Sequence, residues 1–180
     1  YPEIPRTLTA YGAQIEWVPA DEGVRQAIRV AEQMGADNGC VVLDQFATPY
    51  NVDAHYKTTG PEVMEDLPDA DVFVAGLGTG GTLMGVGRRL KEANPKAQVI
   101  AVEPHPGYQV QGLKSLADGF IPPILDFDML DGRILVRSRH AFRGAAELMR
   151  REAIFAGVSS GAVLHAALKV INRLERANVV

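Results

Sequence analysis

A glycine-rich segment carries the residue types and spacing most suited to chemistry. Residues 76–82 read Gly-Leu-Gly-Thr-Gly-Gly-Thr, and they join an apolar run to a helical pattern. Glycines permit positive φ angles and a close approach of the backbone to a ligand, and consecutive N–H groups at a helix start attract an anion. The segment predicts an anion-binding turn, and a tight turn that binds nothing is the alternative.

Two ligands suit this turn. Gly76, Gly78 and Gly81 match the G-x-G-x-x-G dinucleotide pattern, and Glu103 follows Gly81 by 22 residues, where an acid could bind the ribose of NAD. This alternative is an NAD-dependent oxidoreductase. The other ligand is a single phosphate, held by residues 78–82 with threonine hydroxyls as further donors. The turn by itself leaves both hypotheses open.

A second segment of small residues also leads into a helical pattern. Residues 157–162 are Gly-Val-Ser-Ser-Gly-Ala, and they would place the hydroxyl of Ser159 at the carboxyl edge of a parallel sheet, where ligands bind in open α/β folds. Alternatively, a serine here caps the helix. Two such loops favour a compact phosphorylated cofactor over an extended dinucleotide.

Extended and helical patterns alternate along the chain and define the elements that must position these loops. Short apolar strands separated by helices predict an α/β fold with a doubly wound parallel sheet covered on both faces. We expect strands at 14–19, 40–44, 71–76 and 97–103, helices at 21–34, 52–56, 82–93, 139–151 and 160–177, one more helix from Pro61, and a long loop at 104–125.

We expect the boundary between two lobes to lie within residues 45–51. We expect residues 1–45 to be the remainder of a smaller α/β lobe and residues 46–180 to be a larger lobe that binds the cofactor phosphate. The chain begins at Tyr1 rather than at methionine, and residues 178–180 have the pattern of a strand start. We therefore expect a portion of a longer protein, truncated at its C-terminus.

Composition excludes several classes of function. The formal net charge is −4, and Lys and Arg are spread along the chain, which argues against nucleic acid and membrane surfaces as partners. Cys40 is the only cysteine, so no internal disulfide can form, and a cytoplasmic location fits. No apolar run approaches the roughly 18 residues of a membrane span. We assign no metal site.

Several segments carry a further signal when they are taken together: residues 11–13, 44–46, 55–62, 74–83, 101–104, 119–122 and 157–162. In this series the chain resembles the cysteine synthase family, within the fold-type-II enzymes that use pyridoxal phosphate (PLP). The segments follow the family's order over nearly the whole chain, which makes the series far more specific than one glycine pattern.

The resemblance implies PLP as cofactor and assigns roles to individual residues. Ser159 would hydrogen-bond the pyridine nitrogen, and a neutral hydroxyl there suits β-elimination because it does not keep that nitrogen protonated. Gln45 would help to bind the substrate carboxylate, with a hydrogen bond between lobes as the alternative, and Phe46 would line the pocket. His55 is assigned a structural role. The residues expected to cradle the cofactor phosphate are Gly78, Thr79, Gly80, Gly81 and Thr82.

The resemblance also places the Schiff-base lysine and the substrate-carboxylate loop before Tyr1, so no catalytic residue is assigned in this chain. For the full-length enzyme it implies β-replacement, in which an activated serine and sulfide give L-cysteine, carried out by a cytoplasmic homodimer. The 180 residues alone are expected to be inactive. A binding domain that kept the fold without the chemistry is a further hypothesis.

The loop that contains Lys114 bears on the choice of activated serine. Six residues, 113–118, separate Gly112 from Gly119. This length resembles relatives that accept O-phosphoserine, in which a cation in the loop binds the phosphate, rather than those that use O-acetylserine. Lys114 is the candidate for this substrate-binding role, and a solvated surface lysine is the alternative.

Overall fold

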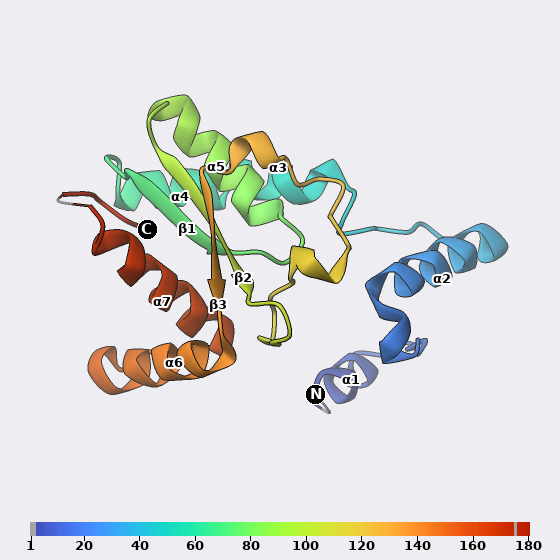
Figure 1. The fold of residues 1–180 in the computed structure, drawn as a ribbon. Coiled ribbons are helices and arrows are strands. Elements are labelled where there is room, and N and C mark those ends of the chain that lie inside the picture. The colour runs from blue at the N-terminus through green and yellow to red at the C-terminus, as the bar shows by residue number, and fades with distance from the viewer. Residues whose placement is uncertain (1–2, 175) are drawn as a thin grey trace. The chain divides into compact units, whose positions relative to one another are not determined.

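The computed structural model describes residues 3–174 and 176–180, and the chain divides into two compact units, Tyr1–Leu43 and Asp44–Val180. The first unit contains α1 (Glu3–Ala10), the 3-10 turn η1 (Ala20–Glu22) and α2 (Gly23–Asn38) (Figure 1). Helix α2 continues to Asn38, beyond the predicted end at residue 34, and is followed by Gly39 in a left-handed conformation.

The two strands expected in the first unit are not formed. Residues 14–19 and 40–43 run without strand structure, because a strand needs a neighbouring strand for its N–H and C=O groups and the described part of this unit supplies none. Apolar side chains therefore stay in solvent, with Trp17 71%, Val41 86% and Leu43 82% exposed.

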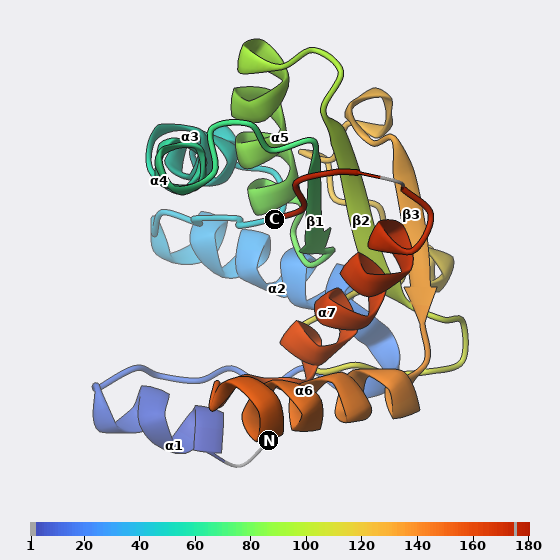
Figure 2. The same ribbon diagram turned by 90° about the vertical axis from the view of Figure 1, so that its left-hand side faces the viewer.

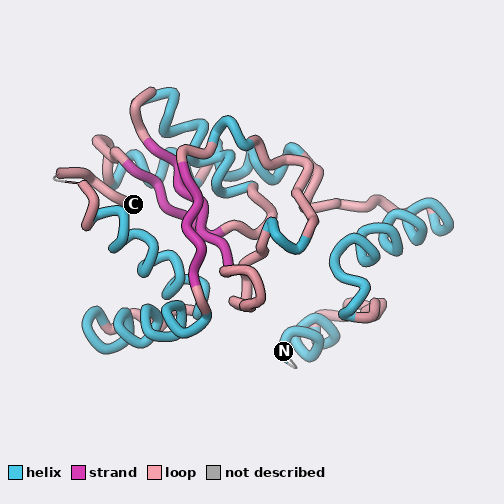
Figure 3. The backbone as a smooth tube through the Cα atoms, in the orientation of Figure 1, coloured by secondary structure: helices cyan, strands magenta, loops and turns pink. Residues whose placement is uncertain are grey.

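The second unit has a three-stranded sheet with helices on both faces. Strands β1 (Val72–Gly76), β2 (Gln98–Pro104) and β3 (Gly132–Val136) lie in that order and are all parallel, which confirms the α/β fold with a parallel sheet. Figure 3 shows these strands as one central group. The helices are α3 (Pro49–Lys57), α4 (Thr59–Asp66), α5 (Gly81–Ala93), α6 (Ser138–Glu152) and α7 (Val158–Ile171), with 3-10 turns η2 (Leu116–Asp118) and η3 (Phe127–Met129).

Alternate strand residues form two apolar cores, one on each face of the sheet. Phe73, Val99 and Ala101 pack in one cluster with residues of α5. Val72, Val74 and Ile100 pack in the other with residues of α6 and α7. Figures 1 and 2 accordingly show α5 and α7 on opposite sides of the strands. The sheet is thus doubly wound, as alternation with period 2 requires when both faces are covered.

Strand β3 was not predicted from the sequence. It is five residues long, begins with Gly132 and Arg133, and only Val136 is fully buried, so its apolar signal is weak. Its place is determined by pairing with β2, from Ile100 opposite Gly132 to Pro104 opposite Val136. At the other side of the sheet, Val179 forms a parallel bridge with Val72, in keeping with the strand pattern of residues 178–180. No helix among residues 3–174 and 176–180 has both the length and the apolar character needed to cross a bilayer.

Helices α6 and α7 approach each other through glycine. A Cβ on Gly144 would overlap the backbone of Gly161, and a Cβ on Gly161 would overlap the backbone at Ala141 and Ala145. Backbone atoms on both sides cannot move aside as a flexible side chain could. The contact between these two helices therefore depends on the absence of both side chains.

We expect Gly144→Ala to lower the free energy of unfolding by about 1–3 kcal/mol, because the added methyl forces the helices apart. In an unconstrained helix the same substitution would raise the free energy of unfolding, so the direction of the change distinguishes the two cases. Chemical denaturation of the chain measures the effect. Arg143→Ala, at the exposed neighbouring position, is the control and should change stability by about 0.5 kcal/mol or less. Equal effects of the two substitutions would contradict the close contact.

Candidate functional site

The glycine-rich turn lies where β1 ends and α5 begins, at the carboxyl edge of the parallel sheet. The Leu77 N–H donates to the Val102 carbonyl (2.8 Å), which fixes the turn to the neighbouring strand, and the Met84 N–H donates to the Gly80 carbonyl (2.9 Å). Gly80 has φ +95°, a left-handed conformation that a residue with a side chain adopts only under strain. This edge is the general ligand position of open α/β sheets.

Most backbone N–H groups of the turn point to no protein acceptor. The Gly81 N–H contacts the Thr79 Oγ1 atom (3.3 Å), whereas within the described residues no acceptor is found for the N–H groups of Gly78, Thr79, Gly80 and Thr82. These donors stand at the positive end of a 13-residue helix. The turn is therefore open and can bind an anion such as a phosphate, rather than being closed on itself.

Helix α3 holds the two threonine hydroxyls of the turn. The Asn51 side-chain amide donates to Thr79 Oγ1 (2.9 Å) and to the Gln45 carbonyl (2.8 Å). His55 Nε2 lies 3.1 Å from Thr82 Oγ1, and its Nδ1 lies 3.0 Å from Thr59 Oγ1. Both hydroxyls are therefore held in defined positions beside the open N–H groups.

Sequence reasoning assigned neither Asn51 nor His55 to the site. His55 was given a structural role, and Asn51 was not singled out. Their spacing of four residues in a helix, which puts both on one face, was the available signal. It could not be used without knowing that this face is turned towards the glycine-rich turn.

Glycines on α5 allow α3 to come this close. The Asn51 amide occupies the space that a Cβ on Gly81 would need, and a Cβ on Gly85 would lie 2.6 Å from the His55 Cβ. Gly81 and Gly85 share a face of α5. Gly85 is needed for the contact between the two helices, and Gly81 is needed for both this contact and the turn. The glycine pattern therefore has two physical causes.

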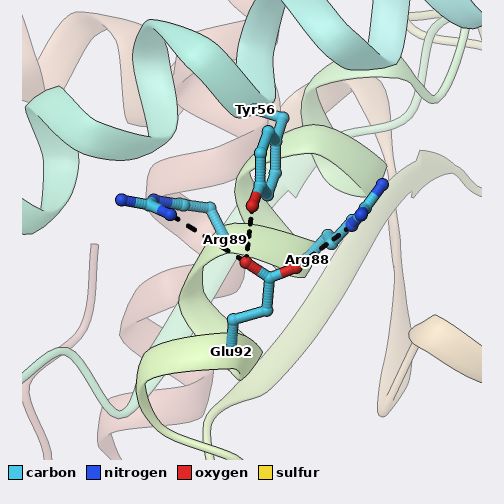
Figure 4. A network of polar contacts seen from close by, with 4 residues as sticks. All are labelled: Tyr56, Arg88, Arg89 and Glu92. Atoms are coloured by element: carbon cyan, nitrogen blue, oxygen red, sulfur yellow. Dashed lines mark hydrogen bonds and ion pairs between the residues drawn. The ribbon is translucent and has the colours of Figure 1, made fainter.

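A polar network joins the same two helices further along α5 (Figure 4). The Tyr56 hydroxyl donates to Glu92 Oε2 (2.6 Å), Arg88 Nε lies 3.2 Å from Glu92 Oε1, and the Arg88 guanidinium lies 4.8 Å from the centre of the Tyr56 ring. The hydrogen bond from Tyr56, followed by the Arg88 contact, lowers the pKa of the Glu92 carboxyl. The network is exposed, so we assign it a modest part in holding α3 on α5.

Ser159 lies near the turn, with the Gly112 loop beside both. A Cβ on Gly112 would lie 3.5 Å from the Ser159 Oγ atom, and a Cβ on Gly78 would lie 3.5 Å from the Gly112 carbonyl oxygen. Helix α7 has Gly157 in its N-cap position, so Ser159 lies inside the first turn and does not cap the helix. Its hydroxyl remains available at the site.

The three residues predicted to bind substrate lie in two neighbouring segments. Phe46 is 7% exposed, and its ring meets that of Phe120 edge to face at 5.1 Å. The Lys114 ammonium lies 5.3 Å from the centre of the Phe46 ring, within range of a cation–π contact. Gln45 has an exposed side chain, and its carbonyl accepts the bond from Asn51.

Glu103 is not available to a dinucleotide ribose. It is 1% exposed, its Oε2 accepts the Leu116 N–H (2.8 Å), and its Oε1 pairs with Arg133 Nη1 (3.1 Å). Both carboxylate oxygens are thus engaged within the protein. The hypothesis of an NAD site loses the acid on which it depended.

Comparison with known proteins agrees with this geometry. Residues 3–180 match the family described as pyridoxal-phosphate dependent enzyme, and the chain belongs to that family. Its cofactor is therefore PLP. The resemblance to cysteine synthases is also confirmed, because the matching relatives carry that name.

Two relatives and two solved structures illustrate the similarity. The cysteine synthase of Staphylococcus aureus is 35% identical over 96% of this chain and 59% of its own length, and cysteine synthase B of Pseudomonas aeruginosa is 37% identical over 96% and 58%. The cysteine synthase structure from Entamoeba histolytica has a TM-score of 0.88 at 30% identity, covering 99% of this chain and 56% of that one. O-ureido-L-serine synthase also gives 0.88 at 30% identity, covering 97% and 58%. The chain therefore spans less than two thirds of these relatives.

The residues present fit the cofactor. Open N–H groups at a helix start and two held threonine hydroxyls suit a phosphate monoester. Gly78 and Gly112 have no Cβ atoms to occupy the space beside the turn. The Ser159 hydroxyl lies next to Gly112. These are the polar groups that a compact phosphorylated ring needs.

We expect Asn51→Ala to weaken binding of PLP by roughly two- to tenfold, because one neutral hydrogen bond to the turn is lost. Titration of PLP into the protein, followed by calorimetry, gives the affinity. Asn94→Ala is the matched control, since Asn94 also hydrogen-bonds backbone groups but stands at the opposite end of α5. A loss of affinity of the same size in both variants would show that Asn51 has no particular connection to the turn.

Proposed function

We propose that the complete protein makes L-cysteine by PLP-dependent β-replacement, from an activated serine and a sulfide donor. The observation that carries this proposal is the open glycine-rich turn with Ser159 near it, in a chain whose relatives are cysteine synthases. Bound PLP supplies the electron sink that labilises bonds at the substrate's α-carbon. The chain's own residues bind, orient and shield the reacting groups.

Each role follows from the position of the residue. The N–H groups of residues 78–80 and 82 hold the phosphate, and Asn51 and His55 keep the threonine hydroxyls directed at it. The Ser159 hydroxyl meets the pyridine nitrogen without supplying a charge, which suits elimination of a β-substituent. Gln45 binds the substrate carboxylate, and the buried Phe46 ring excludes water from the pocket.

We further propose that the catalytic protein is a cytoplasmic homodimer in which residues 1–45 belong to a smaller α/β lobe. The exposed Trp17, Val41 and Leu43 support this assignment, because strands at 14–19 and 40–44 would gain partners and cover these side chains in a completed sheet. The lysine that binds the cofactor then lies in a segment before Tyr1.

The activated serine in this proposal is O-phosphoserine. The position of Lys114 supports this choice, since its ammonium group lies against the Phe46 ring. Phe46 follows Gln45, whose carbonyl accepts a hydrogen bond from the same Asn51 side chain that holds the glycine-rich turn. A cation at this place favours a doubly charged leaving group over a neutral acetyl ester.

We expect Lys114→Ala in the complete enzyme to raise KM for O-phosphoserine about ten- to a hundredfold, since a charge-assisted phosphate contact is worth about 1.5–3 kcal/mol. The KM for O-acetylserine should change little. Steady-state cysteine formation with each substrate measures both. Lys96→Ala removes an exposed lysine at the far end of α5 and is the control. Matched effects on both substrates would leave Lys114 as a solvated residue.

We expect these 180 residues alone to form no cysteine and to label no single lysine. In the described structure Lys57 and Lys91 are paired with Asp53 and Asp131. A lysine that forms a Schiff base must present a free amine, and these two amines are held in ion pairs. Incubation with PLP, borohydride reduction and peptide mapping test the claim. Stoichiometric labelling at one site, with sulfide-dependent cysteine formation, would overturn it. The lysines concerned are Lys57, Lys91, Lys96, Lys114 and Lys169.

A further inference from the structure

Glu103 is the only ionisable side chain that is buried within the described residues, and the single other buried polar side chain there is Ser115. Both belong to one neighbourhood, the start of η2 in the Lys114 loop. A buried carboxylate is costly unless it is paired and hydrogen-bonded. Packing alone does not explain why a carboxylate is buried at Glu103, beside the start of η2.

The Lys114 loop is attached to the sheet by bonds on both sides of Ser115. The Lys114 N–H donates to the Leu77 carbonyl (2.8 Å), just before the glycine-rich turn, and the Leu116 N–H donates to Glu103 Oε2 (2.8 Å). The Ser115 side chain accepts from the Ala117 N–H (3.3 Å) and starts η2. The direction in which the Lys114 side chain leaves the loop is therefore fixed between these two attachments.

The second attachment combines packing with a hydrogen bond, because the Leu116 side chain also packs against the apolar core that includes residues of α5. A cavity of about 530 Å³ borders the loop and is lined by Glu103, Pro106, Ser115, Leu116, Ala117, Arg133 and Leu135. On this side the loop meets open space in place of a close-packed surface. The bond from the Leu116 N–H to Glu103 is therefore the directional contact on this side, and it acts together with the packing of the Leu116 side chain.

Arg133 is the cation that pairs with the buried Glu103 side chain. It stands on β3 opposite Ala101, diagonally adjacent to Glu103 on the same face of the sheet, and its Nη1 lies 3.1 Å from Glu103 Oε1. The Arg133 side chain is 48% exposed, so the pair is half in water and half in the protein. A charged acceptor binds the Leu116 N–H about twice as strongly as a neutral one.

We propose that Glu103, charged and paired with Arg133, is a positioning residue that holds Lys114 at the substrate pocket and so determines selectivity for a phosphorylated leaving group. This rests on the proposed role of Lys114. Glu103 touches neither substrate nor cofactor. It acts through the Leu116 N–H, which is two residues beyond Lys114, and through the strand that carries Arg133.

A purely structural Glu103 would affect all substrates alike. A positioning role instead affects the ratio of kcat/KM for O-phosphoserine to that for O-acetylserine. It also predicts that the effect vanishes once Lys114 is removed, because nothing is then left to position. These two properties separate the hypotheses.

The test measures that ratio in the complete enzyme for Glu103→Gln, which keeps the shape and loses the charge. We expect the ratio to fall about fivefold, in line with the difference between a charged and a neutral acceptor. Arg133→Ala, which removes the paired cation from its half-exposed position, should lower it in the same direction. In the Lys114→Ala background, Glu103→Gln should leave the ratio unchanged. Hydrogen exchange of the Leu116 amide, which needs no activity, should become faster in both single variants.

Asp131→Asn is the matched control. Asp131 also accepts a backbone N–H, from Val99 (2.8 Å), and also pairs with a cation, Lys91 (2.7 Å), but it precedes β3 and bonds near the amino end of β2, away from the Lys114 loop. We expect it to affect stability and leave the substrate ratio unchanged.

The outcomes are distinct. If Lys114→Ala changes the ratio and neither Glu103→Gln nor Arg133→Ala does, Glu103 is not a positioning residue and this inference is wrong. If Lys114→Ala leaves the ratio unchanged, the proposed reading of the phosphate by Lys114 fails, and the selectivity role of Glu103 fails with it. An unchanged Leu116 exchange rate in Glu103→Gln would likewise contradict the attachment of the loop.

Discussion

At Gly80 the backbone passes through a left-handed conformation and leaves a row of N–H groups without protein acceptors at the start of α5. Unpaired backbone donors in a partly buried place cost free energy, so the rest of the site must hold them in position until an anion binds. Helix α3 does this through Asn51 and His55, and α5 admits α3 because Gly81 and Gly85 have no side chains. The turn and the helix contact are therefore one arrangement.

The sheet adds the remaining groups at the same edge. The parallel order β1-β2-β3 brings the glycine-rich turn, Glu103 and the loop after β2 to the carboxyl ends of adjacent strands. The start of α7 adds Ser159 from the opposite face of the sheet. The polar groups along this edge differ in charge. Ser159 contributes a neutral hydroxyl, Lys114 contributes a cation, and the buried Glu103 carboxylate accepts a backbone N–H from Leu116.

Much of this could be predicted from the sequence, because local rules and global structure agree in the second unit. The glycine-rich turn, the strand before it and the helix after it follow directly from composition and period. Strand β3 could not be predicted, since its place depends on pairing with β2 rather than on its own apolar pattern. The strands expected in the first unit are not formed for the converse reason, because an apolar pattern forms no strand without a partner. Asn51, His55 and the use of Glu103 depend on contacts 13 to 28 residues away in sequence, which a local pattern cannot show.

The most direct test of the account is nuclear magnetic resonance of the chain, with backbone amides assigned, during titration with inorganic phosphate and then with PLP. We expect the amides of residues 78–80 and 82 to shift in a saturable manner with both ligands, and the Ser159 region to respond to PLP alone, because only PLP carries the ring. Saturable shifts confined to other helix starts or to exposed arginines, with residues 78–82 unchanged, would contradict the assignment of the glycine-rich turn as the phosphate site.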